Sequence, residues 1–352
     1  MTAPAASLGA LRLIRYLEER PAGFGPLLIL THDHPDPDAL ASAWALSRLA
    51  QALCRVRSRI VYSGVVGRRE NVAMLKSLWI PAHHLWKSDL QSARIALVDT
   101  QPPFQNNRFP VERRPEIIID HHPRHPRTRA DFAIIDESAG ATTTILAEAL
   151  QAAEVGVTWR LATAIVHAIG AETQNLRRDA GPRDIAAYRA YLPQADLQAL
   201  GRIVNPPRSA AFFRMFARGI CDAFMCRGVI GVHLRGIPDP DAVARIADFL
   251  LTHERMRWSL VTGRYQGRLH VSLRTTSTSD DAGRLLKKLL GGGDRAGGHR
   301  MMAGGSLSVG CAAPEKAWRQ AEERVVRSFL RSRRVTGRVE YPFRLDGTHP
   351  AD

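Results

Sequence analysis

The sequence has little cysteine and lacks long apolar runs. Only 4 of its 352 residues are cysteine, and no two of them form a CxxC pair or another zinc-binding spacing. We therefore expect neither a structural zinc site nor a disulfide framework. No segment approaches the roughly 18 continuous apolar residues of a membrane-spanning helix, and residues 1–10 lack the charged start and apolar core of a secretory signal. These absences predict a soluble, cytoplasmic protein that does not associate with a membrane.

Acidic residues are outnumbered in this chain. The 49 Lys and Arg residues against 34 Asp and Glu give a formal net charge of +15. Such an excess suits an anionic partner, namely a nucleotide, a nucleic acid or phosphate. The arginines are scattered, with a denser run only over residues 324–338. Solvated arginine-rich faces explain this pattern as well as an extended nucleic-acid footprint does, so long nucleic acid is not the favoured partner.

Short apolar runs alternate with helical patterns through the first half of the chain. The predicted strands are 27–31, 59–63, 94–98 and 116–119, and their alternation with helices indicates a doubly wound parallel sheet. The composition changes near residue 180, and a second αβ pattern begins after the prolines at 206–207. We therefore predict an α/β domain over 1–179, a linker over 180–208, a smaller α/β domain over 209–335 and a C-terminal tail over 336–352.

Acidic and histidine side chains follow apolar runs at four places, within segments 27–38, 95–99, 117–122 and 168–173. Because ligands lie beyond the carboxyl ends of the strands in a parallel sheet, we expect these side chains to meet in one crevice. His32, Asp36 and Asp38 are evenly spaced on one loop and can point to the same side. Histidine with several carboxylates suits a divalent cation such as Mn²⁺ or Mg²⁺. Asp99 could bridge two such ions, and the number of anionic ligands favours two over one.

Several ordered motifs resemble those of the DHH phosphoesterase superfamily. In the first half they are THDHPDPDALAS (31–42), VDT (98–100) and DHH (120–122). In the second half, VSLR (271–274), GGH (297–299) and AGG (303–305) are similar to motifs of the DHHA1 type of C-terminal domain. The resemblance extends over about residues 25–330. It implies an N-terminal DHH domain with a doubly wound parallel sheet, joined by a helical linker to a smaller α/β DHHA1-type domain, with the active site between them.

The resemblance implies a ligand set for two divalent metal ions, with Mn²⁺ expected first and Mg²⁺ or Co²⁺ as alternatives. The implied metal ligands are His32, Asp36, Asp38, Asp99 and His121. The fourth motif departs from the family, because Glu172-Thr173 stands where an Asp-Thr pair is usual. The extra methylene pushes the carboxylate of Glu172 outward. Glu172 is therefore a sixth candidate ligand whose reach differs from that of the family's aspartate.

The resemblance also implies catalytic and substrate-binding roles. His122 would contact the substrate phosphate or the attacking water, Asp120 would orient the histidine pair, and Asp99 would complete the catalytic set. The predicted nucleotide-phosphate anchor is Arg274 with Gly297, Gly298 and His299. Glycine lets backbone N–H groups approach an anion, and an arginine fork can bind a phosphate through two hydrogen bonds. The threonines at 142–144 begin a predicted helix and suit capping or phosphate contact.

The function implied by this resemblance is a two-metal-dependent phosphoesterase. It would hydrolyse short oligonucleotides, dinucleotides or 3′-phosphoadenosine 5′-phosphate to 5′-mononucleotides, by attack of a metal-bound hydroxide on phosphorus. Two alternatives stay open: a pyrophosphatase or exopolyphosphatase-like hydrolase, and a weakly catalytic regulatory nucleotide-binding module. The residues do not choose among these substrates or metals, and both a monomer and a homodimer are compatible with them.

Overall fold

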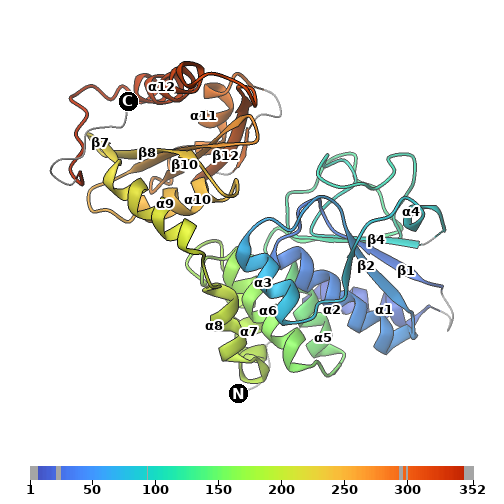
Figure 1. Cartoon of the computed structure of the whole chain (residues 1–352). Helices are drawn as coiled ribbons and strands as arrows, with labels where there is room; N and C mark the ends of the chain where they lie inside the picture. The colour runs from blue at the N-terminus through green and yellow to red at the C-terminus, as the bar shows by residue number, and fades with distance from the viewer. Residues whose placement is uncertain (1–6, 21–24, 93, 293–295, 299, 345–352) are drawn as a thin grey trace. The chain divides into compact units, whose positions relative to one another are not determined.

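The computed structural model describes residues 7–20, 25–92, 94–292, 296–298 and 300–344. The chain divides into two compact units, Met1–Pro207 and Arg208–Asp352 (Figure 1). Each unit has a six-stranded sheet and its own apolar clusters. No helix in the described part of the chain combines the length and the apolar character needed to cross a bilayer.

The first unit is built on a parallel sheet with the strand order β3-β2-β1-β4-β5-β6. The strands are β1 (Leu27–Leu30), β2 (Ser58–Tyr62), β3 (Ala82–His84), β4 (Arg94–Val98), β5 (Ile117–Asp120) and β6 (Phe132–Ile135). The central strands β1, β4 and β5 are nearly continuous apolar runs because side chains on both of their faces are buried. The parallel sheet and the second, smaller sheet domain confirm the predicted α/β fold class. The short strands β3 and β6 were not predicted.

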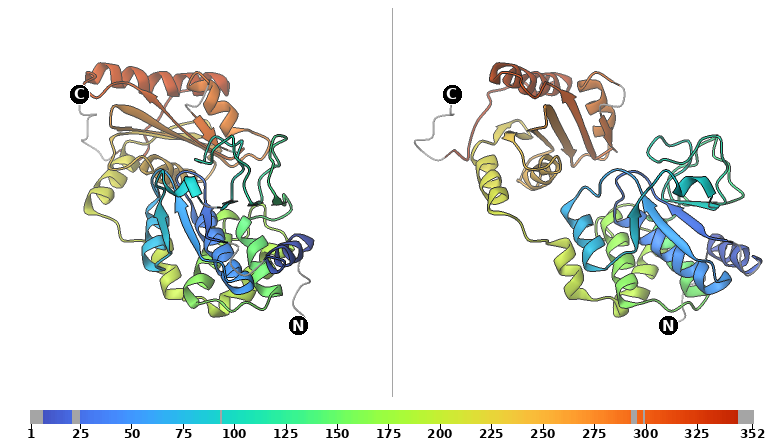
Figure 2. Two further views of the ribbon diagram at one scale, coloured as in Figure 1. Left: turned by 90° about the vertical axis from the view of Figure 1, so that its right-hand side faces the viewer. Right: turned by 45° about the vertical axis from the view of Figure 1, so that its right-hand side comes forward.

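Helices cover mainly one face of this sheet. They are α1 (Leu8–Glu18), α2 (Pro37–Cys54), α3 (Arg69–Ser77), α5 (Thr142–Ala152), α6 (Trp159–Glu172), α7 (Pro182–Tyr191) and α8 (Leu197–Val204). Apolar residues of α2, α5 and α6, such as Leu46, Ile145 and Ile165, form one buried cluster with the sheet. The opposite face packs against α4 (Asp89–Ser92) and the segments after β4 and β5, as the teal and green loops in Figure 2 show. Within the predicted linker, α7, a 3-10 turn at Leu192–Gln194 and α8 thus belong to the first unit.

The second unit has a mixed sheet with the order β11-β12-β10-β9-β8-β7, in which only β8 and β9 pair in parallel. Its strands are β7 (Phe224–Cys226), β8 (Val229–Gly236), β9 (Trp258–Tyr265), β10 (Arg268–Thr275), β11 (Ala296–Gly298) and β12 (Met302–Ser308). Its helices are α9 (Ala210–Cys221), α10 (Ala242–Leu250), α11 (Ala282–Leu289) and α12 (Glu315–Ser332). One face packs on α11 and α12 and the other on α9 and α10, because apolar side chains of β10 and β8 point to opposite sides. Beyond α12, Glu340 forms a β-bridge with Met225.

Candidate metal centre

The candidate site lies where the strand order of the first sheet reverses. Strands β2 and β3 extend the sheet to one side of β1, and β4, β5 and β6 extend it to the other. Loops leaving the carboxyl ends of β1 and β4 diverge at such a point and leave a crevice for ligands. The segments that follow β1, β4 and β5 carry His32 to Asp38, Asp99, and His121-His122. Residues distant in sequence are therefore brought to one edge of the sheet.

Asp99 belongs to two groups of possible metal ligands. In the first group, His32 Nε2 lies 3.6 Å from Asp99 Oδ2 and 3.7 Å from Asp36 Oδ1. One ligand atom from each of these three residues lies within 4.8 Å of the others. Asp99 has a φ of 59°, a left-handed conformation that aspartate tolerates because its short polar side chain bonds locally. Backbone conformations of this kind concentrate at functional sites.

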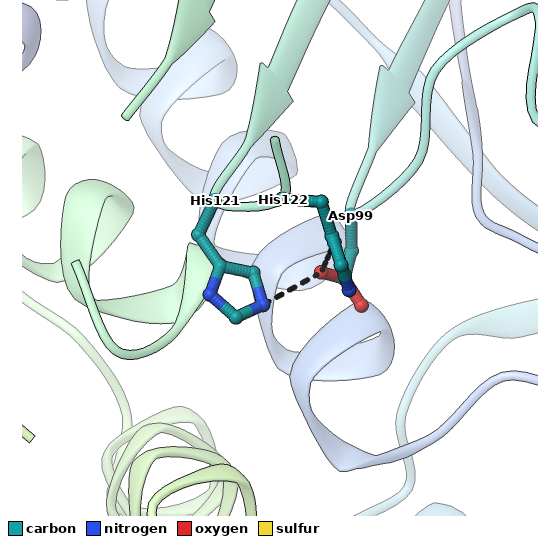
Figure 3. A group of neighbouring side chains, drawn as sticks. All are labelled: Asp99, His121 and His122. Carbon is teal, nitrogen blue, oxygen red and sulfur yellow. Dashed lines mark ion pairs between the residues drawn. The ribbon is translucent and has the colours of Figure 1, made fainter. Parts of the chain in front are cut away.

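The second group consists of Asp99, His121 and His122 (Figure 3). Asp99 Oδ1 lies 3.8 Å from His121 Nε2 and 3.7 Å from His122 Nδ1. Asp38 Oδ2 is 3.9 Å from the same nitrogen of His121. The two oxygens of the Asp99 carboxylate therefore face different groups. This is the arrangement expected of a ligand that bridges two ions.

The N-terminus of α5 holds two of these carboxylates. The backbone N–H groups of Thr142 and Thr143 each donate to Asp38 at 2.8 Å. The hydroxyl of Thr142 donates to Asp99 Oδ1 at 2.9 Å. Asp38 and Asp99 are 1% and 3% exposed, so these donors replace water that cannot reach the carboxylates. The positive end of the helix dipole adds to the stabilisation of their charge.

Asp120 links His122 to a residue that the sequence motifs did not identify. Asp120 is fully buried, and its Oδ1 lies 2.9 Å from His122 Nδ1. Gln101 donates from Nε2 to Asp120 Oδ2 at 2.7 Å. The Gln101 Oε1 atom accepts from His125 N at 2.9 Å and from Thr128 Oγ1 at 2.8 Å. One buried amide thus fixes both Asp120 and the loop after His122. The only feature of the sequence that could have pointed to Gln101 is its position two residues after Asp99.

The carboxylates at this edge repel one another. Burial raises the pKa of Asp99 well above its usual value, and the charge of Asp38 raises it further. Burial likewise raises the pKa of Glu172, and the charges of Asp36 and Asp38 add to the effect and bring it to about 7. The cluster therefore has a negative potential that a divalent cation would relieve.

The two titrating histidines respond to the same potential. Burial lowers the pKa of His32, but its interactions with Asp36 and Asp99 outweigh burial and raise the pKa to about 11. Burial also lowers the pKa of His122, and the hydrogen bond to Asp120 and the charge of Asp99 raise it to about 9. A proton and a metal cation therefore compete for these ring nitrogens.

The hydrogen bonds of the histidines fit metal binding. His32 Nδ1 lies 2.8 Å from the Asp33 carbonyl oxygen, and His121 Nδ1 lies 3.3 Å from that of Ala139. Because a carbonyl only accepts, Nδ1 of each ring carries a proton, which leaves Nε2, on the side of the carboxylates, as the nitrogen that a cation can bind. His121 Nε2 is buried and has no hydrogen-bond partner within the described residues. An orphaned nitrogen 3.8–3.9 Å from two carboxylates suits a shared cation.

Glu172 stands at the end of α6 and belongs to neither ligand group among the described residues. The chain then turns through Gln174, Asn175 and Leu176, whose φ angles are 49°, 57° and 63°. Asn175 N donates to the Gly170 carbonyl at 2.7 Å and closes this turn. Three successive left-handed residues without glycine cost roughly 1–2 kcal/mol each. The turn therefore fixes where α6 ends and hence where Glu172 lies.

The predicted substrate anchor lies in the second unit. Arg274 in β10 is 7% exposed, and its Nε donates to Asp248 Oδ1 at 2.5 Å. Its Nη1 donates to the carbonyl groups of Leu273 and Ala303 at 3.1 Å. The guanidinium is thus tied to α10 and to β12. These contacts fix its orientation at the end of β10.

The glycines of the anchor are in β11. Gly297 and Gly298 are exposed, and Gly298 pairs with Ala303 of β12. Gly298 has a φ of 143°, and a Cβ there would lie 2.3 Å from the Met302 carbonyl oxygen, so only glycine fits. The structure therefore places Gly298 and Arg274 beside the same part of β12. His299 lies outside the described residues.

Comparison with known proteins identifies both units. A family model described as "DHH family, N-terminal domain" matches residues 26–169, and a model described as "DHHA1 domain" matches residues 228–325. The chain is also 32% identical over 326 residues to an uncharacterized protein of Methanocaldococcus jannaschii. That alignment covers 91% of this chain and 66% of the other protein, so the chain spans about two thirds of the length of the curated relative it matches.

Solved structures with a similar fold include the following two. An exopolyphosphatase-related protein from Bacteroides fragilis aligns with a TM-score of 0.68 at 15% identity, covering 93% of this chain and 98% of that one. RecJ from Thermus thermophilus, in complex with Mn²⁺, aligns with a TM-score of 0.53 at 14% identity, covering 94% of this chain and 56% of that one. At such low identity these likenesses establish the fold alone.

Proposed function

Because this chain belongs to the DHH family and carries a DHHA1 domain in its second half, we propose that it is a metal-dependent phosphoesterase. Its substrates are short oligonucleotides, dinucleotides or 3′-phosphoadenosine 5′-phosphate, and its products are 5′-mononucleotides. The observation that carries this proposal is the position of Asp99. One of its oxygens faces His32, and the other faces His121 and His122.

The ligand groups suit two divalent cations, with Mn²⁺ as the first candidate and Mg²⁺ or Co²⁺ as alternatives. His32, Asp36 and Asp99 would hold one. Asp38 and Asp99, whose oxygens both lie within 4 Å of His121 Nε2, would hold the other together with His121. Such ions supply a water of lowered pKa and neutralise charge on the transferred phosphoryl group. Glu172 is a candidate for a further ligand, because Asp36 and Asp38 act on its carboxyl group.

The imidazole of His122 is positioned to contact the substrate. Asp120 Oδ1 occupies its Nδ1 side, so Nε2 is the nitrogen that can donate to a phosphate oxygen. The ring of Phe104 packs edge-on against His122, with a centroid distance of 6.4 Å, and restricts its rotation. Gln101 in turn holds Asp120. In this proposal Asp120 and Gln101 orient His122 without contacting the substrate.

A nucleotide substrate is favoured over pyrophosphate or polyphosphate by the second unit. The DHHA1 match covers β8 to α12, which includes Arg274 and the glycines of β11. Exposed backbone at Gly297 and Gly298 offers N–H groups to a phosphate. The net charge of +15 suits an anionic substrate of either kind and does not decide between them.

The test is a turnover assay of the full chain with Mn²⁺. The panel contains ribo-oligonucleotides of two to five residues, 3′-phosphoadenosine 5′-phosphate, pyrophosphate, polyphosphate and a long single strand. Products are separated by chromatography. We expect 5′-mononucleotides from the short oligonucleotides, and a loss on the order of 10³-fold in Asp99→Asn, because an amide cannot bridge two cations.

Asp131→Asn is the matched control, since it removes an exposed carboxylate paired with Arg114 in the same unit. It should keep wild-type turnover. Release of phosphate from polyphosphate or pyrophosphate alone would replace our proposal with the exopolyphosphatase alternative. Nucleotide binding without turnover under any divalent metal would leave only the regulatory binding module.

A further inference from the structure

A basic depression lies in the second unit, apart from Arg274 and the glycines of β11. Its volume is about 240 Å³, and its lining residues are Arg268, Ser306, Leu307, Ser308 and Arg324. Arg268 begins β10, the serines end β12, and Arg324 is on α12, elements that Figure 1 labels in the second unit. Among the described lining residues none is acidic.

The Arg268 side chain is exposed but held in one orientation. Its Nε and Nη2 atoms donate to the Ser306 hydroxyl oxygen at 3.1 Å and 2.9 Å. This partner is neutral, so the guanidinium keeps its full positive charge. Burial and the charge of Arg268 both lower the pKa of His270, the next residue on the same face of β10. With two arginines and no acidic side chain among its described lining residues, the depression is basic.

The two arginines of the depression differ in their partners from other arginines of the second unit. Arg319 and Arg327 pair with Glu315 and Glu323 one helical turn away, at 3.4 Å. Within the described part of the chain, no ion pair joins Arg268 or Arg324 to a carboxylate. Two like charges around one concavity repel each other, and an anion placed between them removes the repulsion. Guanidinium forks with neighbouring hydroxyls match the oxygens of a phosphate.

The sheet connects this depression to the predicted nucleotide anchor. Strand β12 pairs with Gly298 at Ala303 and reaches Ser308 five residues later, about 17 Å along an antiparallel strand. Tyr265 lies directly opposite Arg268 in the register of β9 and β10, so an aromatic ring stands beside the arginine on one face.

We propose that Arg268 and Arg324 form a second phosphate subsite, which binds the backbone of an oligonucleotide beyond the nucleotide held at β11. The subsite makes the enzyme sensitive to substrate length. This inference rests on the proposed function, because it assumes that the substrate is a nucleotide strand. Its ligand is a phosphodiester group, which shares its chemistry with free phosphate.

The experiment compares an Arg268→Gln/Arg324→Gln variant with the wild type on a diribonucleotide and a pentaribonucleotide. We expect KM for the pentamer to rise about tenfold, as for lost hydrogen bonds to a charged group, with kcat and the dinucleotide KM within about twofold. The salt dependence of pentamer binding should weaken by about 0.7 in logarithmic slope for each lost phosphate contact. Arg319→Gln/Arg327→Gln removes the same charge from the same unit and should leave the ratio of the two KM values unchanged.

Equal changes for both substrates, or an unchanged ratio, would overturn the subsite. Free phosphate is distinguished by calorimetry with inorganic phosphate. If the variant loses phosphate binding but keeps the pentamer-to-dimer ratio, the site binds free phosphate and the oligonucleotide assignment is wrong. If the wild type hydrolyses no oligonucleotide, the proposed function fails separately. Fluorescence anisotropy with a labelled pentamer then still shows whether Arg268 and Arg324 bind the strand.

Discussion

The two units collect charge of opposite sign in opposite surroundings. In the first unit Asp38, Asp99 and Asp120 are almost fully buried, and each accepts hydrogen bonds from neutral donors. In the second unit Arg268 and Arg324 are exposed to water. A buried carboxylate depends on its protein neighbours, whereas an exposed guanidinium keeps most of its hydration. The first site therefore rests on a few contacts with large effects, and the second on several weak ones.

Metal removal should give the largest difference between the units. A ligand at 100 times its dissociation constant stabilises the folded state by about 2.7 kcal/mol. We expect chelation of Mn²⁺ to remove stability of this order from the first unit and none from the second. Hydrogen exchange should show faster exchange in β1, β4 and β5 after chelation, with β8 to β10 unchanged. Equal acceleration in both sheets would contradict the assignment of the ligands to one unit.

A smaller loss is expected from Gln101→Met, which keeps the length of the side chain but removes its polar atoms. Asp120 Oδ2 loses its donor at 2.7 Å, and His122 loses the support behind it. Substitution of the outer partners of a metal site typically costs 10–100-fold in activity or metal affinity, so we expect kcat to fall by about this factor.

Thr128→Val is the control for the other side of the same amide, because it removes only the hydroxyl bonded to Gln101 Oε1. It should cost about 1 kcal/mol of stability with kcat nearly unchanged. If both variants lose activity in proportion to stability, Gln101 has a structural role only.

The next effect concerns pH and a buried histidine of the first unit. Burial lowers the pKa of His167 to about 4, although the charge of Glu70 opposes this, and His167 Nε2 has no hydrogen-bond partner among the described residues. The unfolded chain takes up a proton below about pH 6.5 and the folded chain only near pH 4. This contribution to stability is therefore complete above pH 6.5 and falls as the pH drops, by about 2 kcal/mol at pH 5.

Urea unfolding at pH 7 and pH 5 measures this change. In His167→Gln the difference between the two pH values should shrink by that amount. His83, exposed on β3 of the same unit, provides the matched His83→Gln control, which should leave the difference as in the wild type. An unaltered pH dependence in His167→Gln would show that other groups control acid sensitivity.

The smallest effect should come from an exposed ion pair in the second unit. The side chains of Arg327 and Glu323 are 64% and 63% exposed and 3.4 Å apart. Pairs of this kind contribute roughly 0.3–0.5 kcal/mol on a helix, so Arg327→Gln should shift the unfolding free energy by no more than that. A loss above about 1 kcal/mol, measured by urea unfolding, would contradict the expectation that exposed charges contribute much less to stability than buried ones.

The central strands of the first sheet were predictable because their environment is uniform. Strands β1, β4 and β5 are buried on both faces and therefore appear as unbroken apolar runs in the sequence. The edge strand β3 consists of Ala82, His83 and His84 and shows no such run. Strand β12 reads MAGGSLS, in which the glycines hide the alternation of buried and exposed positions. Pairing with β10 makes it a strand, and that partner is distant in sequence.

The sequence pattern led to the candidate ligands and to Asp120, but not to Gln101 or to the hydrogen bonds that α5 makes with Asp38. His32, Asp36, Asp99, His121 and His122 follow apolar runs, and the structure gathers them at one edge. The role of Gln101 depends on bonds to residues 19 and 27 positions later in the chain. The hydrogen bonds from the N-terminus of α5 to Asp38 join residues that are separated by 104 and 105 positions in the chain. Sequence patterns within one helix or strand do not reveal contacts between residues so far apart in the chain.

The strand order of the first sheet affects how the chain folds during its synthesis. Strand β1 leads the sequence but lies beside β4, so its second neighbour is synthesised more than 60 residues after it. Pairings this distant close late because of the entropy of the intervening loop. The ligand groups span residues 32 to 122 and so cannot assemble before β5 has left the ribosome and joined the sheet. If the proposed cations bind, their uptake by the growing chain would report that β1, β4 and β5 have joined, before β6 completes the sheet.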